Sequence, residues 1–243
     1  MAHGTPDWGL VGPKNITYGL DDLGEHAVRL GSPDLWDRRG DVVYVSYFRE
    51  GLGSMLYGAF GAGGRVDLVV GYSRQGAYCL RLRAGSDAGR EATVQLVLPL
   101  QDPSAVGLEF SFSVDDWTSE VRDEISWWDG ARGHTASVAY DHPGQRLMYY
   151  TAGAVWDELQ AGVLLYPFPR CQHTMKLVVD MGAGDYVRFL VDDQAYDMRG
   201  WEVHSAPMAM AGYWQFAVRH YAVAGHNPDC YVDSVIVTQN EPR

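Results

Sequence analysis

The sequence has few cysteines, few basic residues and no long apolar run. Its 243 residues include three cysteines, at positions 79, 171 and 230, and an odd number at such wide spacing is neither a disulfide framework nor a Cys-x-x-Cys metal site. Lysine and arginine total 19 against 31 acidic residues, which leaves a net charge of −12. A field of this sign repels phosphate backbones, so we expect no nucleic-acid partner.

Targeting features are also missing from the sequence. No stretch approaches about 18 consecutive apolar residues, so we expect no membrane-spanning helix and no membrane partner. Residues 1–7 have neither a basic n-region nor an apolar h-region, which predicts that there is no signal peptide. We therefore expect synthesis in the cytoplasm.

Hydrophobic residues are abundant, at 47%, and most of them recur with a period of two. Leu108, Phe110, Phe112 and Val114 alternate with polar residues, as in a strand with one dry and one wet face. Similar runs, separated by turn residues, cover residues 42–48, 66–70, 78–82, 93–98, 121–128, 134–140, 146–151, 155–159, 174–181, 186–192, 213–223 and 231–238. The layout predicts an all-β, antiparallel two-sheet β-sandwich of jelly-roll type, most clearly in the meander of residues 107–197.

Residues 1–40 differ from the rest of the chain and are predicted to form an extended arm punctuated by Pro and Gly. Within the arm, Leu20, Leu23, Ala27 and Leu30 fall on one face of a short helical pattern that ends near Gly31. A helix of this size needs something to pack against. Two partners stay open, one end of the sandwich formed by residues 41–243 or a neighbouring subunit.

Several motifs resemble known sandwich proteins. The hairpin around Asp129-Gly130, followed by Tyr140-Asp141, Tyr149-Tyr150 and Trp156, is similar to the middle strands of concanavalin A-like and laminin G-like domains, as are residues 173–180 and 186–192. Residues 47–51 and 231–235 resemble the terminal motifs of jelly-roll carbohydrate-binding modules. The resemblance covers residues 42–238 and implies the fold more than an activity, because such sandwiches host many functions.

The arm has a resemblance of its own. Residues 22–32 and 37–41 are similar to an uncharacterised family of bacterial and phage proteins that share the pattern Asp-Leu-Gly-Glu, Arg-Leu-Gly-Ser and Asp-Arg-Arg-Gly-Asp. No established activity comes with this resemblance.

The terminal motifs of jelly-roll modules often hold a structural calcium ion, which the resemblance therefore implies. Here the opening motif has Ser46-Tyr47 before Glu50, and the closing pair is Asp233-Ser234, so only Glu50 and Asp233 remain as hard oxygen ligands. Calcium takes about six to eight oxygens, several of them commonly carboxylates. Two interpretations stay open, a calcium held by Glu50 and Asp233, or an Asp233 that bonds backbone amides near the first strand. We expect no other cofactor.

Catalysis by a sandwich hydrolase needs two carboxylates about 5 to 9 Å apart across a cleft. Glu120 and Glu124 share one strand face beside Trp128, but the hydrolase pattern Glu-x-Asp-x-x-Glu is absent. The sequence also has no Gly-x-Ser-x-Gly elbow and no His-Glu-x-x-His set. We predict that the protein is not an enzyme, a glycoside hydrolase being the less favoured reading, and that these two carboxylates lie on an exposed strand face.

Exposed aromatic rings with a few placed polar groups are typical of carbohydrate sites. Neighbours on a strand point to opposite faces, so one member of Trp127-Trp128 and one of Tyr149-Tyr150 should face outward. The alternative is that these rings pack on half-buried strands under loops. The candidates for a glycan site are Trp128, Glu124, Arg122, Trp156 and Tyr150.

An extended arm with an amphipathic helix, ahead of a jelly roll that lacks a signal peptide, is typical of a virion decoration or tail protein. Such a protein would contact its own subunits, or other virion or surface proteins, through the arm. We therefore predict a non-catalytic assembly and recognition module, in an oligomer and located in a bacteriophage virion. A carbohydrate-binding, lectin-like module is the alternative prediction.

Overall fold

The computed structural model describes residues 39–74, 77–87, 89–99 and 104–243. Over these ranges the chain forms strands β1 to β16 and no helix, which confirms the all-β prediction. A helix of membrane-spanning length and hydropathy is likewise not found in this part of the chain. The predicted arm and its helix near residues 21–31 lie almost entirely outside the described residues.

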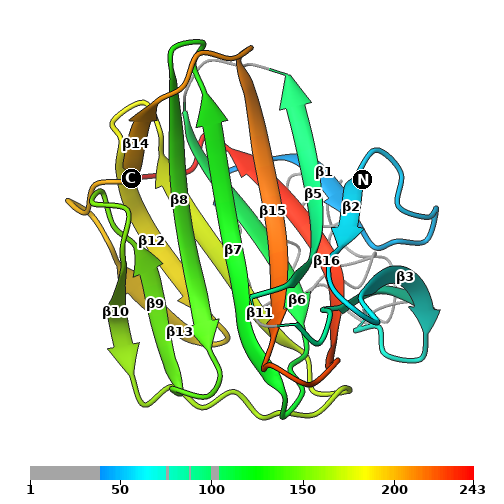
Figure 1. Ribbon diagram of the computed structural model, residues 1–243. Coiled ribbons are helices and arrows are strands. Elements are labelled where there is room, and N and C mark those ends of the chain that lie inside the picture. The colour runs from blue at the N-terminus through cyan, green and yellow to red at the C-terminus, as the bar shows by residue number, and fades with distance from the viewer. Residues whose placement is uncertain (1–38, 75–76, 88, 100–103) are drawn as a thin grey trace, which may run out of the picture. The chain divides into compact units, whose positions relative to one another are not determined.

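Two antiparallel sheets make up the described structure (Figure 1). Sheet A has the order β13–β12–β11–β6–β16–β4–β3, and β1 also pairs with β16. Its strands, in chain order, are β1 (Asp41–Ser46), β3 (Arg65–Val70), β4 (Tyr78–Arg83), β6 (Ala105–Phe112), β11 (His173–Asp180), β12 (Asp185–Val191), β13 (Gln194–Asp197) and β16 (Asp229–Gln239).

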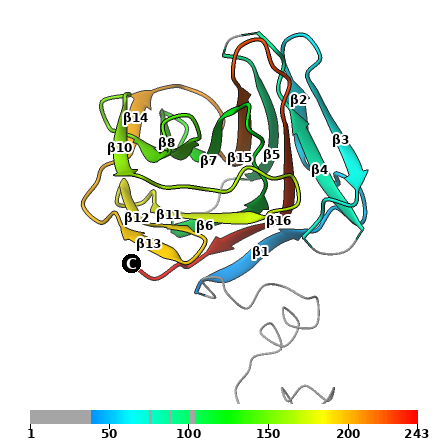
Figure 2. The ribbon, with the colours of Figure 1, turned by 90° about the horizontal axis from the view of Figure 1, so that it is seen from below.

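Sheet B has the order β10–β9–β8–β7–β15–β5–β2, and β14 also pairs with β8. Figure 2 looks along the strands and shows the two sheets face to face, with β2, β3 and β4 together at one end. The strands of sheet B are β2 (Leu56–Ala59), β5 (Glu91–Pro99), β7 (Thr118–Trp128), β8 (Arg132–Asp141), β9 (Arg146–Tyr150), β10 (Trp156–Ala161), β14 (His204–Pro207) and β15 (Tyr213–Ala222).

The period-two pattern explains which side chains fill the space between the sheets. Phe110 and Phe112 from β6, Val121 and Ile125 from β7 and Phe189 from β12 are all fully buried in one core cluster. The alternate residues Glu109 and Ser111 of β6 are buried as well, so the wet face predicted for this strand is wrong. The two-sheet sandwich predicted from alternation is confirmed.

Three short strands were not predicted, and each has a physical reason. β2 lies within residues 51–64, which are rich in glycine, and its Leu56 and Tyr57 are exposed at the edge of sheet B. β13 and β14 have four residues each and also lie at edges or pair off the main path of a sheet. Strands this short show too little alternation to stand out in a sequence.

Polar groups also cross the core and join the sheets. The Tyr186 hydroxyl, from β12 of sheet A, accepts a hydrogen bond from Ser137 N (2.9 Å) and donates one to Tyr150 O (2.7 Å) in sheet B. Because Tyr150 also belongs to the candidate glycan site, this bond fixes the backbone of β9 at that site. Burial raises the pKa of Tyr186, so the hydroxyl stays protonated and can donate.

Candidate functional site

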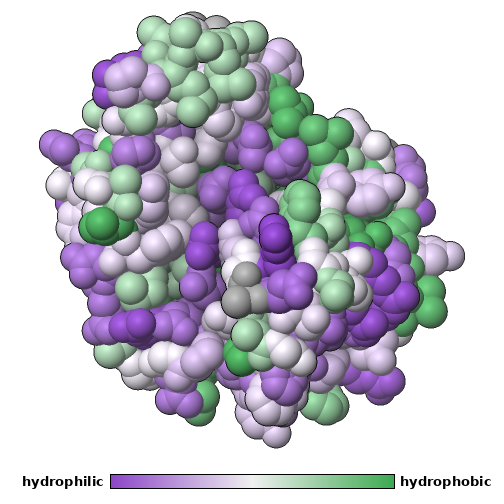
Figure 3. All heavy atoms as spheres, viewed as in Figure 1, coloured by the Kyte–Doolittle hydropathy of each residue, from purple (hydrophilic) through white to green (hydrophobic). Residues whose placement is uncertain are grey.

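The outer face of sheet B contains a hollow of about 520 Å³. Hydrophilic side chains gather at the hollowed centre of this face (Figure 3). Six strands, β7, β8, β9, β10, β14 and β15, supply the lining, which consists of Arg122, Glu124, Ser126, Trp128, Thr135, Ser137, Tyr150, Trp156, His204, Gln215 and Arg219. All five residues predicted as a glycan site are in this lining, so the structure brings the whole predicted set together.

Strand alternation places the predicted residues on this face. On β7, Arg122, Glu124 and Trp128 point outward, whereas Val121 and Ile125 point into the core. Trp127 packs at the core and stacks on Trp214 with ring centroids 5.7 Å apart. In β9, Tyr150 lines the hollow and Tyr149 packs on the core. Each adjacent aromatic pair is therefore split between the two faces, as expected.

An ion-paired arginine lies on the floor of the hollow. Arg219, on β15, bonds Glu91 on β5 (2.7 Å) and Glu124 on β7 (2.8 Å), so the three charges join three neighbouring strands. Burial alone would lower the pKa of Arg219, but the two carboxylates outweigh it and the pKa is raised. The guanidinium is therefore permanently charged and held in place from both sides.

A second arginine is stacked between two aromatic rings. The Arg122 guanidinium carbon lies 4.7 Å from the Trp156 ring centroid and 4.1 Å from that of Tyr221. Its Nε atom donates to Glu120 at 2.7 Å, and Nη1 donates to the Tyr221 hydroxyl at 3.2 Å. Stacking of this kind orients both partners. The Trp156 ring in the lining of the hollow is thus in contact with a fixed guanidinium group.

Two further aromatic residues of the lining are Trp128 and Tyr150. The Trp128 ring stacks on Tyr213 with centroids 4.3 Å apart, and its indole N–H points to the Met208 sulfur at 3.0 Å. Tyr150 stands against Trp156 at a centroid distance of 5.4 Å and against His204 at the same distance. The hollow therefore has aromatic walls and a charged floor.

Sequence reasoning did not identify Glu91, Gln215, Arg219 or His204 as site residues. The alternation of residues 213–223 puts Gln215 and Arg219 on one face, which is the signal that could have found them. Their place beside Glu124 depends on the antiparallel register in which Ala217 faces Glu124. A hydrophobic pattern sets the face of a strand but not which residues oppose one another.

The two carboxylates weighed as a catalytic pair are both bound to arginine. Glu120 pairs with Arg122 at 2.6 Å and Glu124 pairs with Arg219 at 2.8 Å. Both carboxylates therefore take part in ion pairs on the outer face of sheet B.

The two predicted calcium ligands have different surroundings. Glu50 is exposed in the turn after β1. Asp233, on β16, is fully buried, and its carboxylate oxygens accept hydrogen bonds from Ser234 N (2.8 Å) and Arg74 N (3.0 Å). These bonds match the second interpretation of Asp233, as an acceptor for backbone amides. Across the described ranges, no three His, Cys, Asp or Glu side chains are grouped to hold a metal ion.

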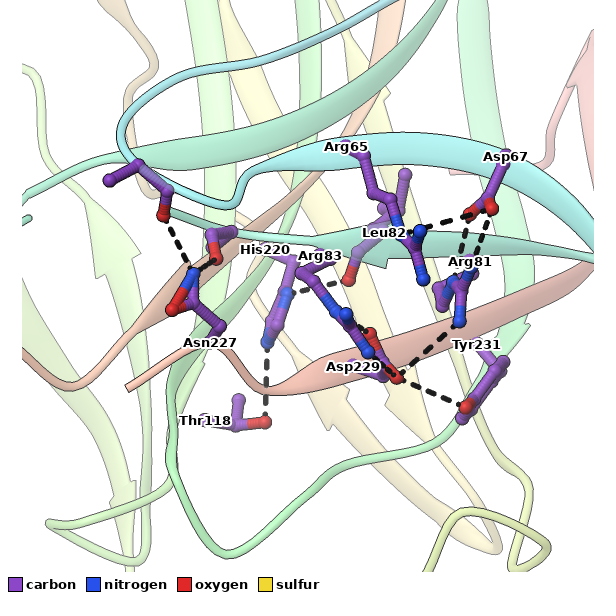
Figure 4. A network of polar contacts seen from close by, with 12 residues as sticks. Arg65, Asp67, Arg81, Leu82, Arg83, Thr118, His220, Asn227, Asp229 and Tyr231 are labelled. Carbon is purple, nitrogen blue, oxygen red and sulfur yellow. Dashed lines mark hydrogen bonds and ion pairs between the residues drawn. The ribbon is translucent and has the colours of Figure 1, made fainter. Parts of the chain in front are cut away.

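Charged side chains also cluster on sheet A, where they join strands (Figure 4). Arg81 donates to Asp67 at 2.8 Å, which links β4 to β3, and Arg83 binds Asp229 through two bonds of 2.6 and 2.7 Å, which link β4 to β16. Tyr231 donates to the same Asp229 at 3.2 Å. This cluster is a structural network that fastens the β3–β4 hairpin.

Solved structures share the architecture of residues 39–243. A protein of unknown function with a galectin-like fold from Bacillus subtilis matches 85% of this chain and 99% of its own, with a TM-score of 0.50 and 12% identity. The fold is a jelly-roll β-sandwich of the concanavalin A-like kind. This confirms the fold implied by the sequence motifs.

Two further proteins have the same jelly-roll fold. The carbohydrate recognition domain of Emp47p matches 84% of this chain and 99% of its own, with a TM-score of 0.50 and 10% identity. The conserved carbohydrate esterase vb_24B_21 from Shiga toxin-encoding bacteriophage phi24B matches 83% and 100%, with a TM-score of 0.50 and 12% identity. A sialidase is matched over 19% of its own length. No protein-family model matches the sequence, and no curated protein does.

Proposed function

We propose that the protein binds a carbohydrate in the hollow of sheet B. The observation that carries the proposal is that Trp128, Tyr150 and Trp156, from three different strands, wall one open hollow whose floor holds Glu124 and Arg122. Aromatic walls stack on the apolar faces of sugar rings, and the polar groups between them bond to hydroxyls. The Emp47p carbohydrate recognition domain has the same fold, which supports the proposal at the level of fold.

We infer that this binding proceeds without hydrolysis. The lining of the hollow contains one carboxylate, Glu124, whereas glycoside hydrolysis generally uses two carboxylates across a cleft. The role proposed for Glu124 is to accept hydrogen bonds from sugar hydroxyls while Arg219 fixes its position.

Replacing Trp156 by Ala is expected to weaken glycan binding about tenfold or more, because the change removes a stacking surface and one of the two rings that contact Arg122. Trp128→Ala should have a similar effect. Affinity would be measured by titration calorimetry against the strongest hit from a glycan array.

Trp117→Ala is the matched control for these two variants. Trp117 is 50% exposed and stacks on His226 at 3.7 Å, but it does not line the hollow. Its replacement should leave affinity unchanged. Equal losses in all three variants, or full affinity in Trp156→Ala and Trp128→Ala, would show that the glycan binds elsewhere; an array without hits would remove the proposal.

We also propose, from the sequence pattern of residues 1–40, that the arm joins the protein to its own subunits or to other virion proteins. The full chain is then expected to sediment as an oligomer, and a chain without residues 1–40 as a smaller species. Analytical ultracentrifugation measures both. A full chain that sediments as a monomer at micromolar concentration would rule out self-assembly through the arm.

A further inference from the structure

Both arginines that line the hollow are paired with carboxylates. Arg219 is bound by Glu91 and Glu124, and Arg122 is bound by Glu120 and lies over the rings of Trp156 and Tyr221. The site therefore contains three carboxylates and two guanidinium groups, so negative charge is in excess. An anionic ligand would have to displace a carboxylate from an arginine before it could pair with that arginine.

Several polar atoms in the lining are set up to accept rather than donate. Glu124 binds Arg219 through Oε1, and its Oε2 atom makes no hydrogen bond to any described residue. Gln215 donates one amide N–H to the Gln95 side-chain oxygen at 2.9 Å, which leaves its carbonyl oxygen as an acceptor and its second N–H as a donor. The His204 Nδ1 atom lies 3.0 Å from Ala152 O and donates to it, which leaves Nε2 as an acceptor when the ring is neutral.

We propose that the hollow selects uncharged, hydroxyl-rich glycans and rejects glycans that carry carboxylates or sulfates. This inference rests on the proposed function and specifies its ligand class. Sugar hydroxyls donate to Glu124 Oε2, to the Gln215 carbonyl oxygen and to His204 Nε2. A uronate or sulfate in the same position would bring its negative charge next to these hydrogen-bond acceptors. It would also lie near three carboxylates of which two guanidinium groups neutralise only two. It also meets the net charge of −12 of the whole chain.

The test compares each neutral glycan with its own acidic derivative. Soluble β-1,4-glucan, β-1,3-glucan and α-glucan oligomers are assayed by calorimetry beside the same oligomers oxidised at C6 to carboxylates, which changes the charge and keeps the linkage. The expected result is that at least one neutral oligomer binds and that its oxidised form binds at least tenfold more weakly. An oxidised form that binds as tightly as its parent, or more tightly, overturns the selectivity. Absence of binding by every pair overturns the proposed function instead.

A charge-removing variant identifies the groups responsible. Glu124→Gln leaves Arg219 with one carboxylate partner, so the oxidised oligomer is expected to gain about tenfold in affinity relative to its neutral parent. Asp197→Asn is the matched control, since it removes one negative charge at the end of β13 in the other sheet, where Asp197 forms an exposed pair with Arg199. An equal gain in both variants would assign the selectivity to the field of the whole protein and would overturn the role of the hollow.

Discussion

Replacing Asp123 by Asn is expected to raise the free energy of unfolding by about 2 kcal/mol at pH 8. Asp123 lies on β7 with its side chain between the two sheets and is 0% exposed. Its Oδ2 atom accepts a hydrogen bond from Leu177 N in sheet A at 3.1 Å, whereas Oδ1 has no hydrogen-bond partner. A buried carboxylate with one oxygen unsatisfied is costly, and an amide of the same shape keeps the acceptor without the charge.

The raised pKa of Asp123 determines the pH range in which the Asn variant is more stable than wild type. Burial raises the pKa of Asp123 well above its ordinary value. Above pH about 4 the folded chain therefore holds a proton on this carboxyl that the unfolded chain has lost, so the stability of the wild-type protein falls as pH rises toward the raised pKa. The advantage of Asp123→Asn should accordingly be present at pH 8 and shrink toward zero near pH 4. Urea unfolding at both pH values measures it.

Asp123→Ala separates the charge from the hydrogen bond. Alanine also removes the carboxylate, but it leaves Leu177 N without an acceptor and opens a cavity, so this variant should be less stable than Asp123→Asn at every pH. An Asn variant that is less stable than wild type at pH 8, or a gain of the same size at pH 4 and pH 8, would contradict the assignment. Glycan affinity should not change, because Asp123 does not line the hollow.

Most of what could be predicted about the site came from the alternation of apolar and polar residues along each strand. It placed Trp128, Glu124 and Arg122 on one face of a strand, and it put Asp123 with Val121 and Ile125 on the other face, which is core. It did not show that an ionisable side chain would cross that core to bond the opposite sheet. Such a contact depends on how two sheets stack, which the pattern along one strand does not specify.

Register is the other property that the sequence left open. Glu91 and Glu124 lie 33 positions apart in the sequence, and they meet at Arg219 because β15 pairs with β5 on one side and with β7 on the other. A shift of one residue would turn Arg219 into the core and remove the floor of the hollow. The candidate aromatic residues could be predicted because each needs only its own strand, whereas the charged bridge needs three strands in one arrangement.

Acid is expected to destabilise the protein through His220, by about 3 kcal/mol between pH 6.5 and pH 4. His220, on β15, is 0% exposed; its Nδ1–H donates to Leu82 O in sheet A at 3.0 Å, and its Nε2 accepts from the Thr118 hydroxyl at 3.3 Å (Figure 4). Burial lowers the pKa of His220 to about 4. As pH falls below about 6.5, the unfolded chain binds a proton at this imidazole, whereas the folded chain does not. The contribution of His220 to the free energy of unfolding is therefore present above that pH and is lost as pH falls below it.

His220→Asn removes the titrating ring and keeps a donor for Leu82 O. This variant should be less stable than wild type at pH 7.5, because it loses the bond to Thr118 and leaves space in the core, but its stability should fall about 3 kcal/mol less on going to pH 4. Thr118→Val keeps the imidazole, so it should lower stability at every pH and retain the acid-side loss. Parallel pH profiles of wild type and His220→Asn would show that acid acts through other groups. Between pH about 4 and 6.5, Asp123 and His220 contribute pH dependences of opposite sign, so each is measured against the variant that lacks it and not from the wild-type profile alone.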